Sequence, residues 1–290
     1  MFLPHQELLD NLRDIEGLAR EEGLAAPGNR LQRYRFLISG LLDASREVDP
    51  DAFPREHGHA RVMWALAEAT ELLGAPAALR AYPPDQRRLK LKAILGGADS
   101  PRAERATSNL SRNISFEMNL AGRLASRGHP VDSSADIDVR TYLGSGSYYI
   151  QCKRPYSVSH FRRSVKEAFE QLAANLGREA GAHGVIAFSV SRLVNPTADA
   201  FVLQSVKQLS ELSRWFDPVM PQLSALVPRL RHPRVLAAIL HFTVPVFVRE
   251  AVGTEAIRTE QHSHVVSLFP PHLHQSTLLR RLVEALARPA

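Results

Sequence analysis

The sequence predicts an α/β protein in which a mixed central sheet is flanked by helices and preceded by an all-helical region. Three observations support this. Apolar residues recur with a helical period in most of the segment 5–73. Acidic and apolar residues then alternate at residues 135–139, which is typical of a strand. Beyond that point, strand-like and helix-like segments alternate, as in proteins that pack helices on a sheet.

The helical region is expected at residues 1–98 and the α/β part at residues 99–290. Gly or Pro follows each of three amphipathic runs, as expected where a helix ends. A basic run at residues 87–92 would lie on or before a helix, either as a solvated face or as a contact for phosphates. The boundary is predicted in the Gly- and Pro-containing segment 96–101. The three runs are His5–Glu22, Arg30–Arg46 and His57–Leu73.

The α/β part begins with a predicted helix at Ile114–Arg127, where apolar residues recur every fourth position from Phe116 and Gly128 acts as a stop. Small residues at 144–147 then predict a tight turn between two antiparallel strands. The elements expected after this hairpin are a helix at Ser159–Leu176, a buried strand at Gly184–Val194, a helical insertion at about residues 200–231, strand-like segments at Val235–Arg249 and His264–Phe269, and a closing helix at Leu278–Ala287.

The hairpin carries the polar residues of greatest interest. In its first strand Asp136 and Asp138 fall on one face, with Ile137 on the other. In the returning strand Gln151 and Lys153 share one face. Strand pairing therefore brings the aspartates close to the Gln and Lys side chains. Which aspartate lies nearer depends on the register, and a one-residue slip would turn both away.

The chain presents a Glu on a helix, then an Asp on a strand, then a Gln-x-Lys motif on the paired strand. This order resembles that of the restriction-endonuclease-like, or PD-(D/E)XK, phosphodiesterase superfamily, and within it Mrr-type members. The similarity spans residues 112–195. It includes the Phe-Glu pair at Glu117, the Gly-His-Pro-Val exit at residues 128–131, the Gln-Cys-Lys-Arg string at residues 151–154, and Gln171 in the following helix.

The resemblance implies metal-dependent hydrolysis of a phosphodiester, with DNA rather than RNA as the expected substrate and Mg²⁺ or Mn²⁺ as the cofactor. Mg²⁺ prefers oxygen ligands, polarises the phosphoryl group and lowers the pKa of the attacking water. A neighbouring lysine offsets the charge that develops on the phosphate. The implied roles are principal metal ligand for Asp138 or Asp136, second ligand for Gln151, transition-state stabilisation for Lys153, metal binding or orientation for Glu117, and a position facing the metal for Gln171.

Gln151 departs from the common pattern, because most members of the superfamily carry an acid at this position. A neutral amide is a weaker ligand for Mg²⁺ than a carboxylate, although Mrr-type relatives also use Gln here. Two alternatives therefore stay open. One is a catalytically inactive module that binds nucleic acid or a protein partner. The other is an ordinary solvated hairpin in which Lys153 pairs with an aspartate.

Composition is compatible with a nucleic-acid partner. The chain has 36 Lys and Arg against 30 Asp and Glu, a net charge of +6 that favours a polyanion and equally suits a simple need for solubility. Arginine makes bidentate contacts with phosphate. The expected nucleic-acid contacts are Arg154, Arg162 and Arg163.

A single cysteine, Cys152, excludes an internal disulfide and a Cys-based zinc cluster, and its predicted inward position suits a small core residue. No apolar run reaches membrane length and the N-terminus lacks a basic, then apolar, signal. We therefore expect a cytoplasmic protein without a membrane partner. The oligomeric state stays open, and a homodimer would suit cleavage of both DNA strands.

Overall fold

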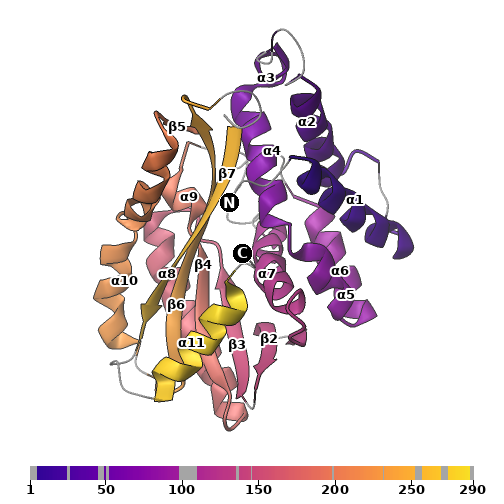
Figure 1. Ribbon diagram of the computed structural model, residues 1–290. Helices are drawn as coiled ribbons and strands as arrows, with labels where there is room; N and C mark the ends of the chain where they lie inside the picture. The colour runs from indigo at the N-terminus through magenta and orange to yellow at the C-terminus, as the bar shows by residue number, and fades with distance from the viewer. Residues whose placement is uncertain are drawn as a thin grey trace.

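The computed structural model shows a group of helices packed beside a sheet (Figure 1). The predicted α/β class, with a helical N-terminal region and a mixed sheet flanked by helices, is confirmed. The structure describes residues 5–24, 27–44, 49, 52–97, 110–134, 137–144, 146–197, 199–230, 232–251, 257–268 and 274–287.

The N-terminal helices follow the predicted apolar periodicity, and the basic run lies on a helix of its own, α6. Two short helices, α3 and α5, were not predicted. The helices are α1 (His5–Glu21), α2 (Arg30–Ala44), α3 (Ala52–His57), α4 (His59–Glu71), α5 (Ala75–Ala81), α6 (Pro84–Leu95) and α7 (Leu110–Ala125).

Within the described residues, seven strands form one mixed sheet. β1, β2 and β3 are antiparallel neighbours, whereas β3, β4 and β6 run parallel to one another. The long strand β6 pairs with β4 and β5 along one edge and with antiparallel β7 along the other. The strands are β1 (Val131–Ser134), β2 (Ile137–Leu143), β3 (Gly146–Lys153), β4 (His183–Ser189), β5 (Phe201–Leu203), β6 (Val235–Val248) and β7 (Ile257–Ser267).

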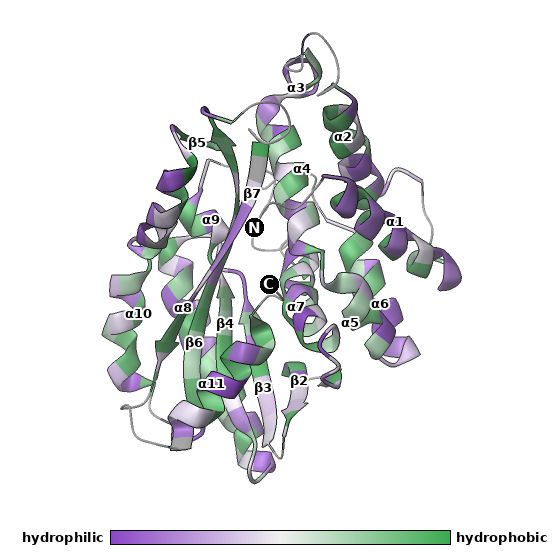
Figure 2. Ribbon diagram, viewed as in Figure 1, coloured by the Kyte–Doolittle hydropathy of each residue, from purple (hydrophilic) through white to green (hydrophobic). Residues whose placement is uncertain are grey.

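Helices cover both faces of the sheet. The N-terminal helices share one apolar cluster with α11 and with one sheet face, whereas α8 and α10 cover the opposite face. In Figure 2 the buried strands β4 and β6 are coloured mainly as hydrophobic, as expected for strands with both faces covered. The later helices are α8 (Val158–Arg178), α9 (Ser191–Val194), α10 (Met220–Leu226) and α11 (His274–Leu286).

The helical region and the sheet share one continuous core. Apolar residues of α1, α2, α4 and α6 belong to the same buried cluster as Val139 of β2 and Ile150 of β3. At the crossing of α5 with α7 the backbones nearly touch, since a Cβ on Gly122 would lie 1.9 Å from the carbonyl oxygen of Gly74. The predicted boundary at residues 98–99 lies in a segment, 98–109, that is outside the described residues.

Three predicted elements are different in the structure. The strand expected at His264–Phe269 is β7, which begins seven residues earlier, at Ile257. The strand expected at residues 184–194 ends at Ser189, and α9 follows it. The helical insertion expected from about residue 200 begins with β5, before a 3₁₀ helix at Val206–Phe216, helix α10, and a 3₁₀ turn at Val227–Arg229. β6 extends beyond the end of β4, so its free edge recruits Phe201–Leu203 as a parallel neighbour. Tertiary pairing overrides local preference here.

Candidate functional site

Strands β2 and β3 bring Asp138 and Gln151 together. Val139 pairs with Ile150, so Asp138 and Gln151 face each other across the hairpin. The Gln151 amide Nε2 donates to Asp138 Oδ2 at 2.6 Å, and the backbone N–H of Cys152 donates to the same oxygen at 2.7 Å. Two donors therefore hold one carboxylate oxygen in a fixed position. Asp136, the other expected ligand, lies outside the described residues.

The predicted alternation does not hold at the first residue of β2. Ile137 was expected on the face opposite Asp138, but it packs in the apolar cluster under α8, on the same side as Tyr149. An irregularity in the pairing of β1 with β2, between Asp132 and Ser134, lies beside it. This local change of register leaves the contact between Asp138 and β3 intact.

Helix α8 closes a pocket over this end of the hairpin. The pocket has a volume of about 340 Å³. The Lys153 Nζ donates to Gln171 Oε1 at 2.9 Å, so the predicted Lys and helical Gln meet at its rim. The residues that line it are Asp138, Gln151 and Lys153 from the hairpin and Gln171, Ala174, Asn175 and Arg178 from α8. We call this the hairpin pocket.

The Asp138 carboxyl is held in a poorly solvated position. Burial raises its pKa, and the N–H of Cys152 and the ammonium groups of Lys153 and Lys90 oppose that rise. A divalent cation would compensate the same burial cost more strongly than these groups, because it carries two charges.

Glu117 lies behind the hairpin pocket and is not among the residues that line it. Its helix, α7, packs on the opposite face of the hairpin, and the residue is 3% exposed. Burial raises its pKa to about 8; the ion pair with Lys90 opposes the rise, and the charge of Asp138 adds to it.

Lys90 is a site residue that the sequence did not identify. The basic run was expected to face solvent or phosphate, but the Lys90 ammonium pairs with buried Glu117. Gln86, one turn earlier on α6, hydrogen-bonds Ser133 of β1 through its side chain at 3.0 Å. Gln86 and Lys90 are four residues apart, so they share a helix face. The four-residue spacing of Gln86 and Lys90 was the one sequence signal that both residues face the protein interior. The neighbouring basic residues obscured this signal.

The Gln151 amide oxygen is buried and has no hydrogen-bond partner among the residues that the structure describes. Leaving a buried carbonyl oxygen unpaired costs about 1–3 kcal/mol. Its position beside Asp138 suits a hard cation, which takes oxygen ligands and keeps several waters. Within the described residues no group of three or more His, Cys, Asp or Glu could hold a metal ion. Asp138 and Gln151 both present oxygen atoms, the type of ligand that Mg²⁺ and Mn²⁺ take, whereas zinc usually takes Cys and His.

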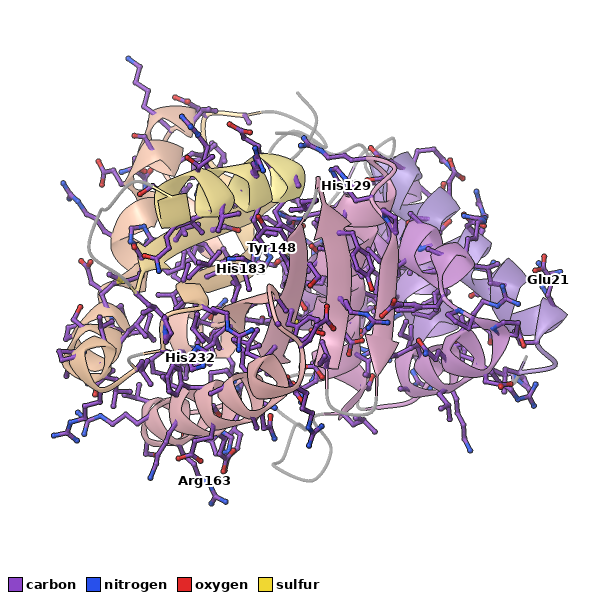
Figure 3. All side chains as sticks on the ribbon, turned by 90° about the horizontal axis from the view of Figure 1, so that it is seen from below. Glu21, His129, Tyr148, Arg163, His183 and His232 are labelled. Carbon is purple, nitrogen blue, oxygen red and sulfur yellow. The ribbon has the colours of Figure 1, made fainter. Side chains whose placement is uncertain are left out.

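The predicted phosphate contact at Arg154 does not fit its position. The residue is 3% exposed and its guanidinium pairs with Glu71 and Glu68 of α4. The chain enters the interface with the N-terminal helices directly after Lys153, and this buries Arg154. Arg162 and Arg163 are exposed on α8. The Arg162 side chain contacts Gln222, and Arg163 pairs with Glu167. Arg163 points outward from the molecule in Figure 3.

Arg154 belongs to a fully buried set of charges, which we call the charge network. The Arg112 Nε contacts Glu68 Oε1 at 2.9 Å, and Arg30 Nη1 lies 3.6 Å from Glu68 Oε2. Burial opposes ionisation of Glu68, but the three arginines hold its pKa below the usual value. The network ties the end of β3 to three N-terminal helices. Its members are Arg30, Glu68, Glu71, Arg112 and Arg154.

No protein-family model, curated protein or solved structure matches this chain. No helix among the described residues is long and apolar enough to cross a membrane. The resemblance to PD-(D/E)XK nucleases stays a prediction.

Proposed function

We propose that this chain is a metal-dependent phosphodiesterase that acts on nucleic acid, most simply as a DNA endonuclease. The observation that carries the proposal is the buried, unpaired amide oxygen of Gln151 beside Asp138, in a pocket that Lys153 also lines. Other buried atoms of the structure also lack a hydrogen-bond partner, but among the described residues that line the hairpin pocket only the Gln151 oxygen does, and a bound cation would explain it.

Asp138 and Gln151 would hold Mg²⁺ or Mn²⁺. Glu117, on the opposite face of the hairpin, would help to orient these two ligands. When bound, the ion would polarise the phosphoryl group and lower the pKa of the attacking water. The Cys152 N–H keeps Asp138 Oδ2 oriented. Lys153, held by Gln171, would place its ammonium against the charge that develops on the phosphate.

The neutral Gln151 is consistent with weak binding of metal by the protein alone. The residues that line the hairpin pocket include one carboxylate, Asp138, and two cationic side chains, Lys153 and Arg178. Mg²⁺ is often held by one or two carboxylates together with substrate phosphates. We therefore expect metal and nucleic acid to bind cooperatively, each strengthening the other.

The test is cleavage of linear, circular and single-stranded DNA with Mg²⁺, Mn²⁺ or EDTA, by the parent protein and by Lys153→Ala and Asp138→Ala. Lys166→Ala is the matched control, because it removes an exposed cation of α8 that is not among the residues that line the hairpin pocket. We expect metal-dependent cleavage by the parent and the control alone. If no substrate is cut with any metal, or if the two site variants cut as well as the parent, the proposal is wrong.

A second candidate is a nuclease-like module that binds nucleic acid without cutting it. The position of Glu117 favours this reading, because the residue pairs with Lys90 and is not among the residues that line the hairpin pocket. Salt-sensitive DNA binding that is indifferent to metal, without cleavage, would support it. A homodimer stays a prediction for either function.

A further inference from the structure

The last two turns of α8 present a polar face to the hairpin pocket. Gln171, Asn175 and Arg178 are spaced at i, i+4 and i+7, so they lie on one side of the helix. The same helix packs apolar residues against the sheet, among them Leu172 and Leu176. Asn175 is 5% exposed although it is polar, and its Oδ1 accepts from Arg178 Nη1 at 3.4 Å. Asn175 is therefore part of the packing of α8, whereas Gln171 and Arg178 are exposed at the opening of the pocket.

The charges on this face are placed as a polyanion would require. Lys153 is at the Gln171 end of the pocket and Arg178 is seven residues further along the helix. Seven residues of α-helix span about 10 Å. One strand of a stacked duplex carries a phosphate every 3.4 Å or so along its axis, so this span corresponds to about three nucleotides. Arginine and amide side chains are common donors to phosphate oxygens.

We propose that Gln171, Asn175 and Arg178 bind the sugar-phosphate backbone of nucleic acid next to the phosphate held at Lys153. This inference rests on the proposed function for the identity of the ligand. It moves the expected contact with nucleic acid from Arg162 and Arg163, at the start of α8, to the end of the helix. Arg178 also suits the negative end of the helix dipole, a stabilising role that would not affect DNA binding.

The experiment measures binding of short labelled duplex and single-stranded oligonucleotides in EDTA, between about 50 and 200 mM salt. Arg178→Gln is compared with Arg163→Gln, which also removes a cation from α8 but outside the pocket. We expect Arg178→Gln to weaken binding by about fivefold to tenfold at low salt and to lower the slope of log K against log salt by about 1. Arg163→Gln should match the parent.

Thermal unfolding of each variant separates the two roles of Arg178, because a purely stabilising residue would lower the melting temperature and leave the salt slope unchanged. The proposal fails if the parent shows no salt-dependent binding, if Arg178→Gln binds like the parent, or if both variants weaken binding equally. Salt-dependent binding that Arg178→Gln weakens, without cleavage under any metal, would support this inference while rejecting the catalytic proposal. Cleavage by an Arg178→Gln variant whose affinity for DNA is unchanged would support the catalytic proposal and reject this inference.

Discussion

The hairpin pocket and the charge network both gather polar side chains at the end of β3, but they differ in how accessible those side chains are. In the charge network the carboxylates of Glu68 and Glu71 pair with arginines, and its members are fully buried. In the hairpin pocket the exposed side chains of Gln171 and Arg178 line an opening beside the buried Gln151 oxygen. Gln151 Oε1 and Glu68 Oε2 both lack a hydrogen-bond partner among the described residues, so accessibility, rather than an unpaired atom, separates the candidate functional site from the structural cluster.

The largest expected effect tests the structural side of this comparison. Arg154→Ala leaves Glu71 buried without its ion-pair partner, which costs about 3–5 kcal/mol of stability. Chemical denaturation would measure the loss. Arg163→Ala is the control and should change stability by less than about 0.5 kcal/mol. An Arg154→Ala protein that is as stable as the parent but binds DNA weakly would reverse the assignment of this residue.

Asp138→Asn tests the functional side. The amide keeps the shape and can still accept from the Cys152 N–H, but it loses the charge that would hold a cation. We expect the cleavage rate to fall by about 10²-fold or more, with binding of Mn²⁺ lost in parallel in titrations of the protein alone. Full metal binding by this variant would remove Asp138 from the set of ligands.

Glu117 provides a pH test of its burial. Burial raises the pKa of Glu117 from 4.5, the value expected in the unfolded chain, to about 8 in the folded protein. Between pH 4.5 and 8 the carboxyl is therefore protonated in the folded state and ionised in the unfolded state. Its contribution to stability is complete below about pH 4.5 and is lost as the pH rises through 8. Between pH 6.0 and 7.5 the free energy of unfolding should fall by about 2 kcal/mol on this account.

The comparison for that test is Glu117→Gln, whose amide does not titrate. Denaturation across the same pH range should show a flatter profile for this variant than for the parent, whatever the difference in absolute stability caused by leaving Lys90 unpaired. Parallel profiles would mean that Glu117 is ionised throughout, with Lys90 outweighing burial.

The smallest effect concerns the unpaired amide. Gln151→Glu adds a carboxylate at the same position, so we expect metal affinity to rise by about tenfold, since the charge count of the ligands tunes affinity. Calorimetric titration with Mn²⁺ would measure it, and Gln171→Glu, at the rim of the pocket, is the comparison. Without metal, the new charge beside Asp138 should lower stability. Equal affinity in parent and variant would argue that residue 151 does not touch the metal.

Much of the site could be predicted from local pattern. The acidic-apolar alternation and the small-residue turn led to the hairpin, and its pairing did bring Asp138 to Gln151. The helical Gln171 was expected to face the same centre and it contacts Lys153. Lys90 and Arg154 could not be placed in this way, because each is buried by segments distant in sequence. The short strand at Phe201–Leu203 was missed for a similar reason, since it depends on the edge of β6.

Local sequence patterns specify most of the longer helices and strands, the hairpin, and the residues that face each other across it. These follow from periods of 3.6 and 2 residues and from turn chemistry, which act over a few residues. Only the tertiary structure decided which cations are buried and which stay accessible. Arg154 and Lys153 are adjacent in sequence, yet one is buried against α4 and the other lines the hairpin pocket. Burial depends on contacts between distant segments, so a residue's neighbours in sequence do not reveal it.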